Sequence, residues 1–209
     1  MRNKPVIIIG NGGHARVLVD ILLLENRRII GYTAPMKEEN HYNLSYIGND
    51  QAILEYAPEN VELVNAIGSV KDTSLREKLF NEFKSQGYFF SSVFHPSAII
   101  SSTVSLGEGV QILAGSVIQP FAKIVDNTIV NTSASIDHDC NIGKHCHIAP
   151  GCVLSGNVTV GDGTHIGTGT TIIQNIRVGK NALIGAGSLV IEDVPNNKVV
   201  YGTPAKEVI

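Results

Sequence analysis

The sequence predicts two fold classes in succession. Residues 1–90 are expected to form an α/β N-terminal domain with a small Rossmann-like βαβ sheet, and residues 91–209 a left-handed parallel β-helix of hexapeptide repeats. The first prediction rests on strand and helix signals that alternate up to about residue 90. The second rests on an aliphatic residue at every sixth position from residue 100 to residue 190.

The N-terminal domain begins with a buried strand. The aliphatic residues 6–9 predict this strand, and the apolar stretch 15–25 predicts the helix that follows. Residues 28–32 and 61–68 predict a second and a third strand. Strands that alternate with helices in this way form a parallel sheet with helices on its faces.

A second helix is predicted near residue 74. Ser74 and Glu77 have the spacing of a capping box, in which two side chains satisfy the first backbone donors of a helix. Gly87 is expected to stop this helix. The residues expected on its inner face are Leu75, Leu79, Phe80 and Phe83.

A glycine-rich turn, residues 10–13, lies between the first strand and the first helix. Backbone N–H groups at such a turn, together with the helix N-terminus, favour a diphosphate. An NAD site also needs an acidic residue at the end of the second strand. Thr33 and Ala34 follow that strand without a carboxylate, so we expect a nucleotide-diphosphate sugar here instead of NAD.

From residue 97 the chain has a strict period of six. The aliphatic positions of the hexads are Ile100, Leu106, Ile112, Ile118, Ile124, Val130, Ile136, Ile142, Ile148, Leu154, Val160, Ile166, Ile172, Val178, Ile184 and Val190. Two residues before each lies, in most hexads, a small residue. A period of six is not that of a helix, and it is typical of a solenoid with short strands and tight turns. Three hexads make one coil, so residues 18 apart stack on one another.

The three cysteines, Cys140, Cys146 and Cys152, all occupy the small inward position. Free cysteine is among the most buried residue types. A catalytic thiolate needs polar and partly exposed surroundings, which this position does not offer. We therefore expect core residues and no cysteine nucleophile.

Four histidines lie outside the core positions of the hexads: His138, His145, His147 and His165. His147 and His165 are 18 residues apart and are expected to point outward and stack in neighbouring coils. His138 lies at a turn beside Asp139. These residues alone leave three interpretations open: surface histidines, a catalytic base, or a zinc site, for which three imidazoles must converge on one point.

The sequence resembles the sugar acetyltransferases of the NeuD/PglD type over nearly its whole length. The stretches that carry the resemblance are VIIIGNGGHARVLVDIL (6–22), HPSAII (95–100), NTSASIDHDCNIGKHCHIAPG (131–151), SGNVTVGDGTHIGTGTTI (155–172) and VVYGTPAK (199–206). The third of these resembles the catalytic coil and is the most specific. The resemblance implies acetyl-CoA as co-substrate, no metal, and a homotrimer in which acetyl-CoA lies between adjacent solenoids.

The resemblance also implies roles for individual residues. His138 corresponds to the general base, and Asp139 to the acidic residue beside it, which is usually glutamate in relatives. His147 corresponds to a histidine that contacts acetyl-CoA, and Gly156 to a glycine whose backbone N–H lies near the thioester carbonyl. The further cofactor-binding positions are Thr168 and Ala186. The positions expected to hold the nucleotide-sugar are Gly12, Gly13, His14 and Gly68; His14 either contacts the sugar or only caps the turn.

These roles suit acetyl transfer, because an amine or hydroxyl must lose a proton as it attacks a thioester, and histidine can accept it near neutral pH. We expect direct N-acetylation of a nucleotide-linked 4-amino-4,6-dideoxy sugar for surface glycan synthesis. The alternatives are O-acetylation of sialic acid, a zinc lyase of the carbonic anhydrase kind, and a solenoid scaffold without activity.

Bulk properties exclude some partners. The 16 basic and 19 acidic residues give a net charge of −3, without the basic surface that nucleic acid requires. No stretch has the roughly 20 apolar residues of a membrane span, and the hydrophobic run before Gly10 is too short for a signal peptide. Three cysteines do not suggest a disulfide framework. We therefore expect a cytoplasmic protein without nucleic-acid or membrane partners.

Overall fold

The computed structural model describes residues 4–70 and 72–208, and internal contacts divide the chain into two compact units. The N-terminal unit consists of Met1–Gly68 and Leu75–Val93, and the solenoid unit of Ser69–Ser74 and Phe94–Ile209. Each unit has a hydrophobic core of its own. The short segment 69–74 therefore packs with the solenoid, although it lies within the N-terminal part of the sequence.

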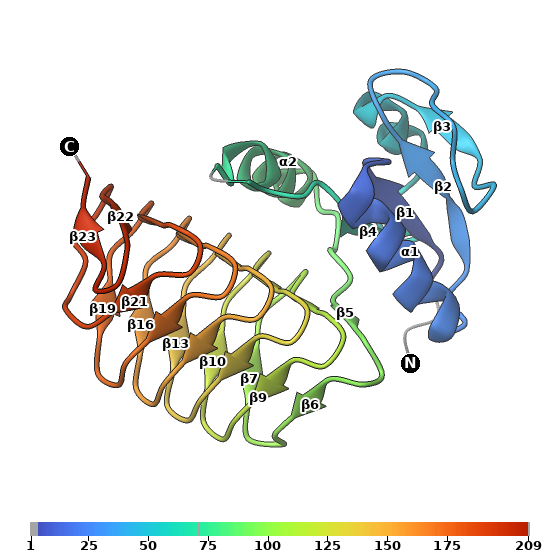
Figure 1. The fold of residues 1–209 in the computed structure, drawn as a ribbon. Coiled ribbons are helices and arrows are strands. Elements are labelled where there is room, and N and C mark those ends of the chain that lie inside the picture. Colours follow the sequence, from blue (N-terminus) through green and yellow to red (C-terminus); the bar gives the residue numbers. More distant parts are fainter. Residues whose placement is uncertain (1–3, 71, 209) are drawn as a thin grey trace. The chain divides into compact units, whose positions relative to one another are not determined.

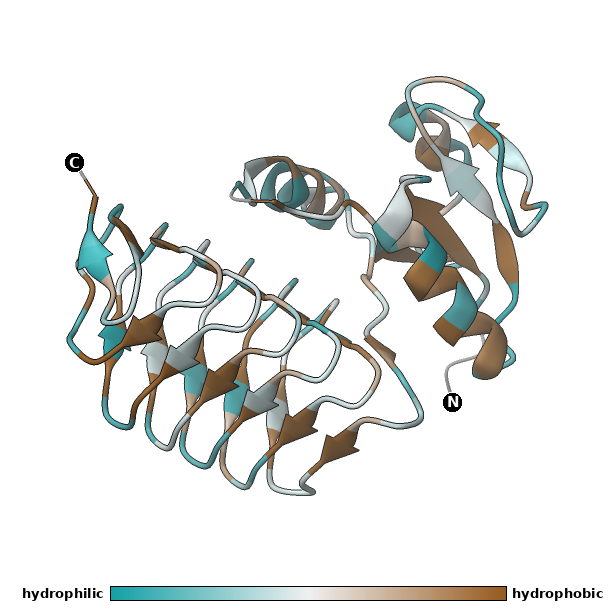
Figure 2. Cartoon of the chain, viewed as in Figure 1, coloured by the Kyte–Doolittle hydropathy of each residue, from teal (hydrophilic) through white to brown (hydrophobic). Residues whose placement is uncertain are grey.

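The N-terminal unit is built on a parallel sheet with the strand order β3-β2-β1-β4. The strands are β1 (Val6–Ile9), β2 (Ile29–Thr33), β3 (Tyr46–Gly48) and β4 (Glu62–Asn65). All side chains of β1 are fully buried, as expected for a central strand covered on both faces, and Figure 2 shows this strand as hydrophobic along its length. β1 confirms the predicted strand with the same bounds, β2 confirms its strand with a shift of one residue, and β4 is shorter than predicted.

Helices cover this sheet. They are α1 (Gly13–Leu24), the 3₁₀ helix η1 (Asp50–Glu55) and α2 (Ser74–Ser85). The capping box predicted at Ser74 is wrong, because Ser74 is already helical and its N–H donates to the carboxylate of Asp72 at 2.8 Å. Leu75, expected on the inner face, is 55% exposed, whereas Leu79, Phe80 and Phe83 are buried as predicted.

The solenoid unit is a left-handed β-helix whose coils follow one another from green to red in Figure 1. The first sheet contains β7 (Ser105–Leu106), β10 (Lys123–Ile124), β13 (Asn141–Ile142), β16 (Thr159–Val160) and β19 (Arg177–Val178). The second contains β6 (Ile99–Ile100), β9 (Val117–Ile118), β12 (Ser135–Ile136), β15 (Val153–Leu154), β18 (Thr171–Ile172) and β21 (Leu189–Val190). The third contains β5 (Val93–Phe94), β8 (Gln111–Ile112), β11 (Ile129–Val130), β14 (His147–Ile148), β17 (His165–Ile166), β20 (Leu183–Ile184), β22 (Val199–Tyr201) and β23 (Lys206–Glu207).

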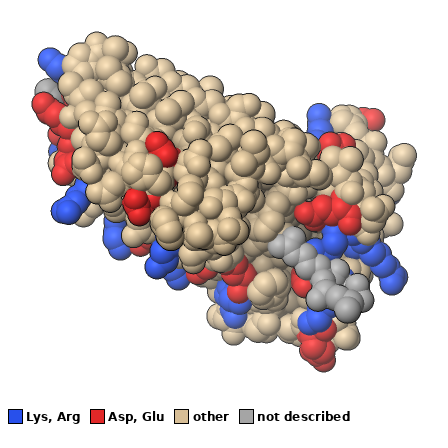
Figure 3. Space-filling model, turned by 90° about the horizontal axis from the view of Figure 1, so that it is seen from below, with Lys and Arg blue, Asp and Glu red and all other residues tan. Residues whose placement is uncertain are grey.

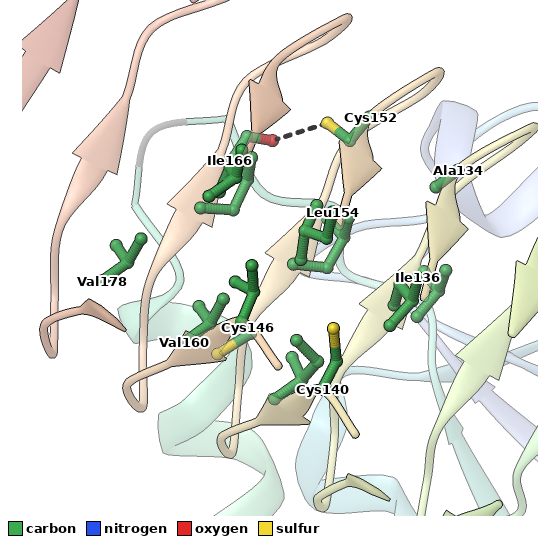
Figure 4. Packing of buried hydrophobic residues seen from close by; sticks show 14 of the residues in the cluster. Ala134, Ile136, Cys140, Cys146, Cys152, Leu154, Val160, Ile166 and Val178 are labelled. Atoms are coloured by element: carbon green, nitrogen blue, oxygen red, sulfur yellow. Dashed lines mark hydrogen bonds between the residues drawn. The ribbon is translucent and has the colours of Figure 1, made fainter. Parts of the chain in front are cut away.

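The aliphatic residue of each hexad is the second residue of a strand and points into the solenoid. The three cysteines are buried in the same core, which confirms their predicted position (Figure 4). The thiol of Cys146 donates to the carbonyl oxygen of Gly161 at 3.1 Å. Inward packing of one aliphatic residue per hexad explains why the period of six is so regular.

The corners of the coils also repeat every six residues. From residue 109 to residue 187 each corner has one residue with positive φ: Gly109, Gly115, Phe121, Asn127, Ser133, Asp139, His145, Gly151, Asn157, Gly163, Gly169, Asn175, Asn181 and Gly187. Glycine, asparagine and aspartate tolerate this left-handed backbone better than other residues do. Backbone geometry therefore restricts the residue types at the corners, just as packing restricts those in the core.

The faces of the solenoid differ in charge. The outward residue of each strand in the second sheet is uncharged: Ile99, Val117, Ser135, Val153, Thr171 and Leu189. In the first sheet, Lys123 and Arg177 stand at the corresponding positions. A broad area with few charged side chains is visible over the coils in Figure 3. We call the face formed by the second sheet the uncharged face.

Candidate active site

His138 lies at the corner that follows β12, with its side chain 59% exposed. Its Nδ1 atom is 2.8 Å from Oδ2 of Asp139. A carboxylate accepts hydrogen bonds and does not donate them, so Nδ1 carries the proton and the lone pair of the neutral ring is on Nε2. The ring is thus held in the tautomer in which Nε2 can accept a proton from a substrate.

The surrounding charges make this imidazole more basic. The hydrogen bond to Asp139 raises the pKa of His138 above its ordinary value of 6.5, and the nearby carboxylate of Asp137 acts in the same direction. Both groups stabilise the protonated ring, which is the form that a general base reaches during the reaction. Asp137 also accepts a hydrogen bond from the backbone N–H of His138 at 2.8 Å.

Gly156 lies one coil further on, against the same ring. A Cβ atom at this position would be 2.7 Å from both Cε1 and Nε2 of His138, closer than real carbon contacts allow. Gly156 is not among the glycines with positive φ, so its backbone does not itself require glycine. The imidazole explains the glycine, because Cε1 and Nε2 of His138 lie where the side chain of any other residue at position 156 would begin.

His147 and His165 stack as predicted. They are paired in register on β14 and β17, with ring centroids 4.9 Å apart in an edge-to-face arrangement. They lie outside the core positions of the hexads as predicted, but they are not surface residues, because both are buried, at 8% exposure. The segment 69–74 explains this: Ser69 binds His147, and Thr73 donates to the carbonyl of Gly163 at 3.2 Å.

Both ring nitrogens of His147 have partners within the solenoid unit. Nδ1 is 2.8 Å from Oγ and 3.0 Å from the carbonyl oxygen of Ser69. Nε2 is 3.0 Å from Nδ2 of Asn131. The carbonyl of Ser69 can only accept and the Asn131 amide donates, so His147 is neutral with its proton on Nδ1.

A cleft of about 360 Å³ opens beside His165 in the solenoid unit. Its lining includes Val70, His165, Thr168, Leu183, Ala186 and Tyr201, and we call it the His165 cleft. The structure thus brings together two of the residues assigned to the cofactor, Thr168 and Ala186. His138 and Gly156 lie at a different corner of the coil, which follows the second sheet and not the third.

In the N-terminal unit, the glycine turn is open. A Cβ atom at Gly12 or at Gly13 would meet nothing within 4 Å, and α1 begins here without a side-chain cap. Gly68, which follows β4, lies against His14, since a Cβ atom there would be 3.2 Å from that of His14. All four residues assigned to the nucleotide-sugar therefore gather at the carboxyl ends of β1 and β4.

β2 itself ends without a carboxylate, as the sequence indicates, but a carboxylate from another part of the chain lies beside its end. The hydroxyl of Thr33 donates to Oδ1 of Asp50 at 2.6 Å. Asp50 begins η1 and is only partly buried. The sequence did not predict this contact, because Asp50 lies between β3 and β4 and not at the end of β2.

Among the described residues, no three histidine, cysteine or acidic side chains are placed to hold a metal ion. Burial raises the pKa of the Cys140 and Cys152 thiols to about 11 and that of Cys146 to about 12. These thiols remain protonated at neutral pH. None of the three has the ionised form that a cysteine nucleophile needs.

Comparisons with known proteins match this arrangement. Residues 5–83 fit the family model described as the PglD N-terminal domain. The structure of PerB from Caulobacter crescentus, in complex with CoA and GDP-perosamine, is 34% identical with a TM-score of 0.90, covering 98% of this chain and 97% of that one. The acetyltransferase domain of PglB from Neisseria gonorrhoeae FA1090, in complex with acetyl coenzyme A, is 29% identical with a TM-score of 0.92, covering 99% and 100%.

The chain belongs to the NeuD/PglD-type sugar acetyltransferase family. WeeI from Acinetobacter baumannii AYE has the same fold at 22% identity, with a TM-score of 0.87 over 98% of this chain and 100% of that one. The predictions of the fold class, of an acetyltransferase and of acetyl-CoA as co-substrate are thereby confirmed. None of the helices in the described part of this acetyltransferase combines the length and apolar character that a membrane span needs.

Three features of the acetyltransferase escaped the sequence analysis: Asp50, the segment 69–74, and the burial of His165. Each depends on contacts between residues far apart in the chain. The hexad pattern placed His165 outside the core, and the residues that cover this part of the solenoid come from before residue 75.

Proposed function

We propose that this acetyltransferase transfers the acetyl group of acetyl-CoA to the amino group of a nucleotide-linked 4-amino-4,6-dideoxy sugar, in a cytoplasmic step of surface glycan synthesis. The observation that carries the proposal is His138, fixed by Asp139 at 2.8 Å with Nε2 free. PglB has been solved with acetyl coenzyme A and PerB with CoA and GDP-perosamine, which supports the two substrate classes.

The proposed reaction is a direct transfer. Nε2 of His138 removes a proton from the amine as its nitrogen attacks the thioester carbonyl, a role worth roughly 10² to 10⁴ in rate. The backbone N–H of Gly156 stabilises the oxyanion of the tetrahedral intermediate. When this intermediate collapses, the C–S bond breaks and the imidazolium returns the proton to the leaving thiolate. Buried thiols with raised pKa values support a route without a covalent enzyme intermediate.

The N-terminal domain, proposed as residues 1–90, would bind the nucleotide-sugar, and the β-helix domain, residues 91–209, would supply the base and the cofactor site. The open turn at Gly12 and Gly13 suits a diphosphate, because it leaves room at the N-terminus of α1, where backbone N–H groups and the helix dipole favour an anion. Asp50 adds a carboxylate near the end of β2, where nucleotide sites commonly bind a ribose hydroxyl. His14 and Gly68, which lie at the carboxyl ends of β1 and β4, would contribute to the same binding site.

The active enzyme is proposed to be a homotrimer. Within one chain, the uncharged face separates the corner that holds His138 from the corner that holds Thr168 and Ala186. Ile99 on this face is 67% exposed, and no charged residue occupies an outward strand position there. Packing of such a face against a second copy would bring the base of one subunit toward the cofactor residues of another. Sedimentation should give a trimer; a fully active monomer would contradict this.

The acceptor is tested by calorimetric titration of the full chain with GDP, UDP, dTDP and sialic acid. We expect one of the nucleoside diphosphates to bind and sialic acid not to bind. Binding of sialic acid alone would favour the alternative, O-acetylation of sialic acid. A zinc lyase would instead show stoichiometric zinc in the purified protein, together with carbon dioxide hydration.

A further inference from the structure

His165 is a buried polar residue with an unmet hydrogen-bonding requirement. Its side chain is almost fully covered, and Nδ1 has no hydrogen-bond partner among the described residues. A buried polar atom without a partner costs on the order of 1–3 kcal/mol, so such atoms are rare and call for an explanation. Burial also lowers the pKa of His165 below 6.5, so the ring is neutral at pH 7 and has one donor and one acceptor.

The neighbouring His147, in contrast, has hydrogen-bond partners at both ring nitrogens. Its two ring nitrogens are occupied by Ser69 and Asn131, and these bonds fix its ring. The two imidazoles touch edge to face at 4.9 Å, but this contact satisfies no nitrogen of His165. Of the stacked pair, His165 is therefore the member with a buried ring nitrogen that no described group satisfies.

The cleft beside His165 has a distinct chemical character. Apart from His165, Thr168 and Tyr201, the lining residues are aliphatic or glycine, with Leu183, Ala186 and Val199 among them. Thr168 and Tyr201 supply the hydroxyl groups. A matching ligand is a slender chain of methylene and methyl groups interrupted by amides. The pantetheine arm of acetyl-CoA has this composition, whereas a sugar has a hydroxyl on most of its carbons and a nucleotide has charged phosphates.

We propose that His165 binds the pantetheine arm of acetyl-CoA through a hydrogen bond to one of its amides, while the fixed ring of His147 packs against it. The proposal rests on the acetyl-CoA dependence proposed above and adds a binding residue to it. An imidazole can serve either side of an amide, because it donates from one nitrogen and accepts at the other.

The ring can turn to meet this partner. No hydrogen bond holds Nδ1, so rotation about the Cβ–Cγ bond exchanges the positions of Nδ1 and Cδ2 without breaking a polar contact. Rotation of His147 would break the bonds to Ser69 and Asn131. The difference in hydrogen bonding thus leaves the ring of His165 able to turn toward a new partner, whereas the ring of His147 is fixed.

The test measures CoA binding and thermal stability of the full chain with His165→Phe and His165→Gln. Phenylalanine keeps the ring contact with His147 and removes the polar atoms, so the Kd for CoA should rise about five- to tenfold, the value of one net hydrogen bond. The Tm should stay level or rise, because the unmet polar atom is gone. Glutamine, which retains a donor and an acceptor, should restore part of the affinity.

Two probes locate the effect on the CoA molecule. Binding of 3′,5′-ADP, which lacks the pantetheine arm, should be unchanged in His165→Phe, as should the KM for the nucleotide-sugar. The matched control is His145→Gln. His145 lies at a corner of the solenoid, does not line the His165 cleft, and is bonded to Asn127 at 2.9 Å. The Kd of this variant for CoA should equal that of the wild type.

The outcomes separate this inference from the proposed function. Failure of the wild type to bind CoA would refute both. Binding of CoA by the wild type with an unchanged Kd in His165→Phe would refute only the role of His165. A lower Tm with unchanged CoA affinity in both variants would identify His165 as a packing residue. A loss of 3′,5′-ADP affinity equal to that of CoA would also contradict the pantetheine contact.

Discussion

Oδ2 of Asp139 lies 2.8 Å from Nδ1 of His138, although the two residues are adjacent in the chain. Neighbouring side chains in an extended strand point to opposite faces, so such a pair needs a turn. Asp139 provides it, with a φ of 60° at the left-handed position that recurs in the corners. The hexad corner thus builds the base and its orienting carboxylate from consecutive residues.

Replacement of His138 by Asn should lower kcat by about 10² to 10⁴, because it removes the base. The side chain is more than half exposed and makes no core contact, so Tm and the KM for both substrates should change little. Thiol release from acetyl-CoA, measured with the accepted nucleotide-sugar, reports the rate. Wild-type turnover in this variant would show that another group accepts the proton.

The pH dependence reports the role of Asp139. Activity requires neutral His138, so kcat/KM should fall as the pH falls through its pKa, which lies above 6.5. Asp139→Asn removes the largest cause of this raised pKa, so the acidic limb should move to lower pH. Asp137→Asn should move it in the same direction by less. A limb that stays in place in both variants would contradict the assignment.

Gly156→Ala should reduce kcat by displacing the ring, since the new methyl group would lie 2.7 Å from Nε2 of His138. If the effect passes through this ring, the substitution should add almost nothing in a chain that already has His138→Asn. Steady-state rates of the two single variants and the double variant complete the cycle. Additive losses would mean that Gly156 acts independently of the base.

The fold was predictable because its regularities are local. One aliphatic residue per hexad determines the core, so Ile136 and Ile148 revealed the coils around the site without tertiary information. The same pattern assigned Cys146 to the interior. Leu75 shows the limit: it has the helical spacing of Leu79 but lies in the first turn of α2, where it is 55% exposed.

Cys146→Ala should keep full activity and lower the free energy of unfolding by about 1 kcal/mol, the usual size of a small core truncation. Its thiol is buried and bonded to Gly161, away from His138 in the coil. Denaturant unfolding and kcat/KM measure the two effects. Loss of activity without loss of stability would support a mechanism in which Cys146 is the nucleophile.

Gly12→Leu should raise the KM for the nucleotide-sugar at least tenfold and leave that for acetyl-CoA unchanged. Gly12 has a φ of −79°, which other residues adopt, and a Cβ atom there meets nothing within 4 Å. The fold should therefore tolerate leucine, whose side chain would occupy the diphosphate position. An equal rise in both KM values would argue against separate sites for the two substrates.

The site was less predictable than the fold, because its remaining features depend on long-range contacts. Thr33 gave no sign of Asp50, which lies 17 residues later, and the hexads gave no sign that Ser69 would cover His147. The outward position of a side chain in a solenoid follows from the period. Its exposure depends on what the rest of the chain places over it.

The most direct measurement is mass spectrometry of GDP-, UDP- and dTDP-linked 4-amino-4,6-dideoxy sugars after incubation with acetyl-CoA and either the wild type or His138→Asn. We expect the wild type to add one acetyl group to one of them, as an amide that survives mild base, and the variant to add it far more slowly. Acetylation of sialic acid alone, as a base-labile ester, or equal rates in the wild type and the variant, would contradict the account.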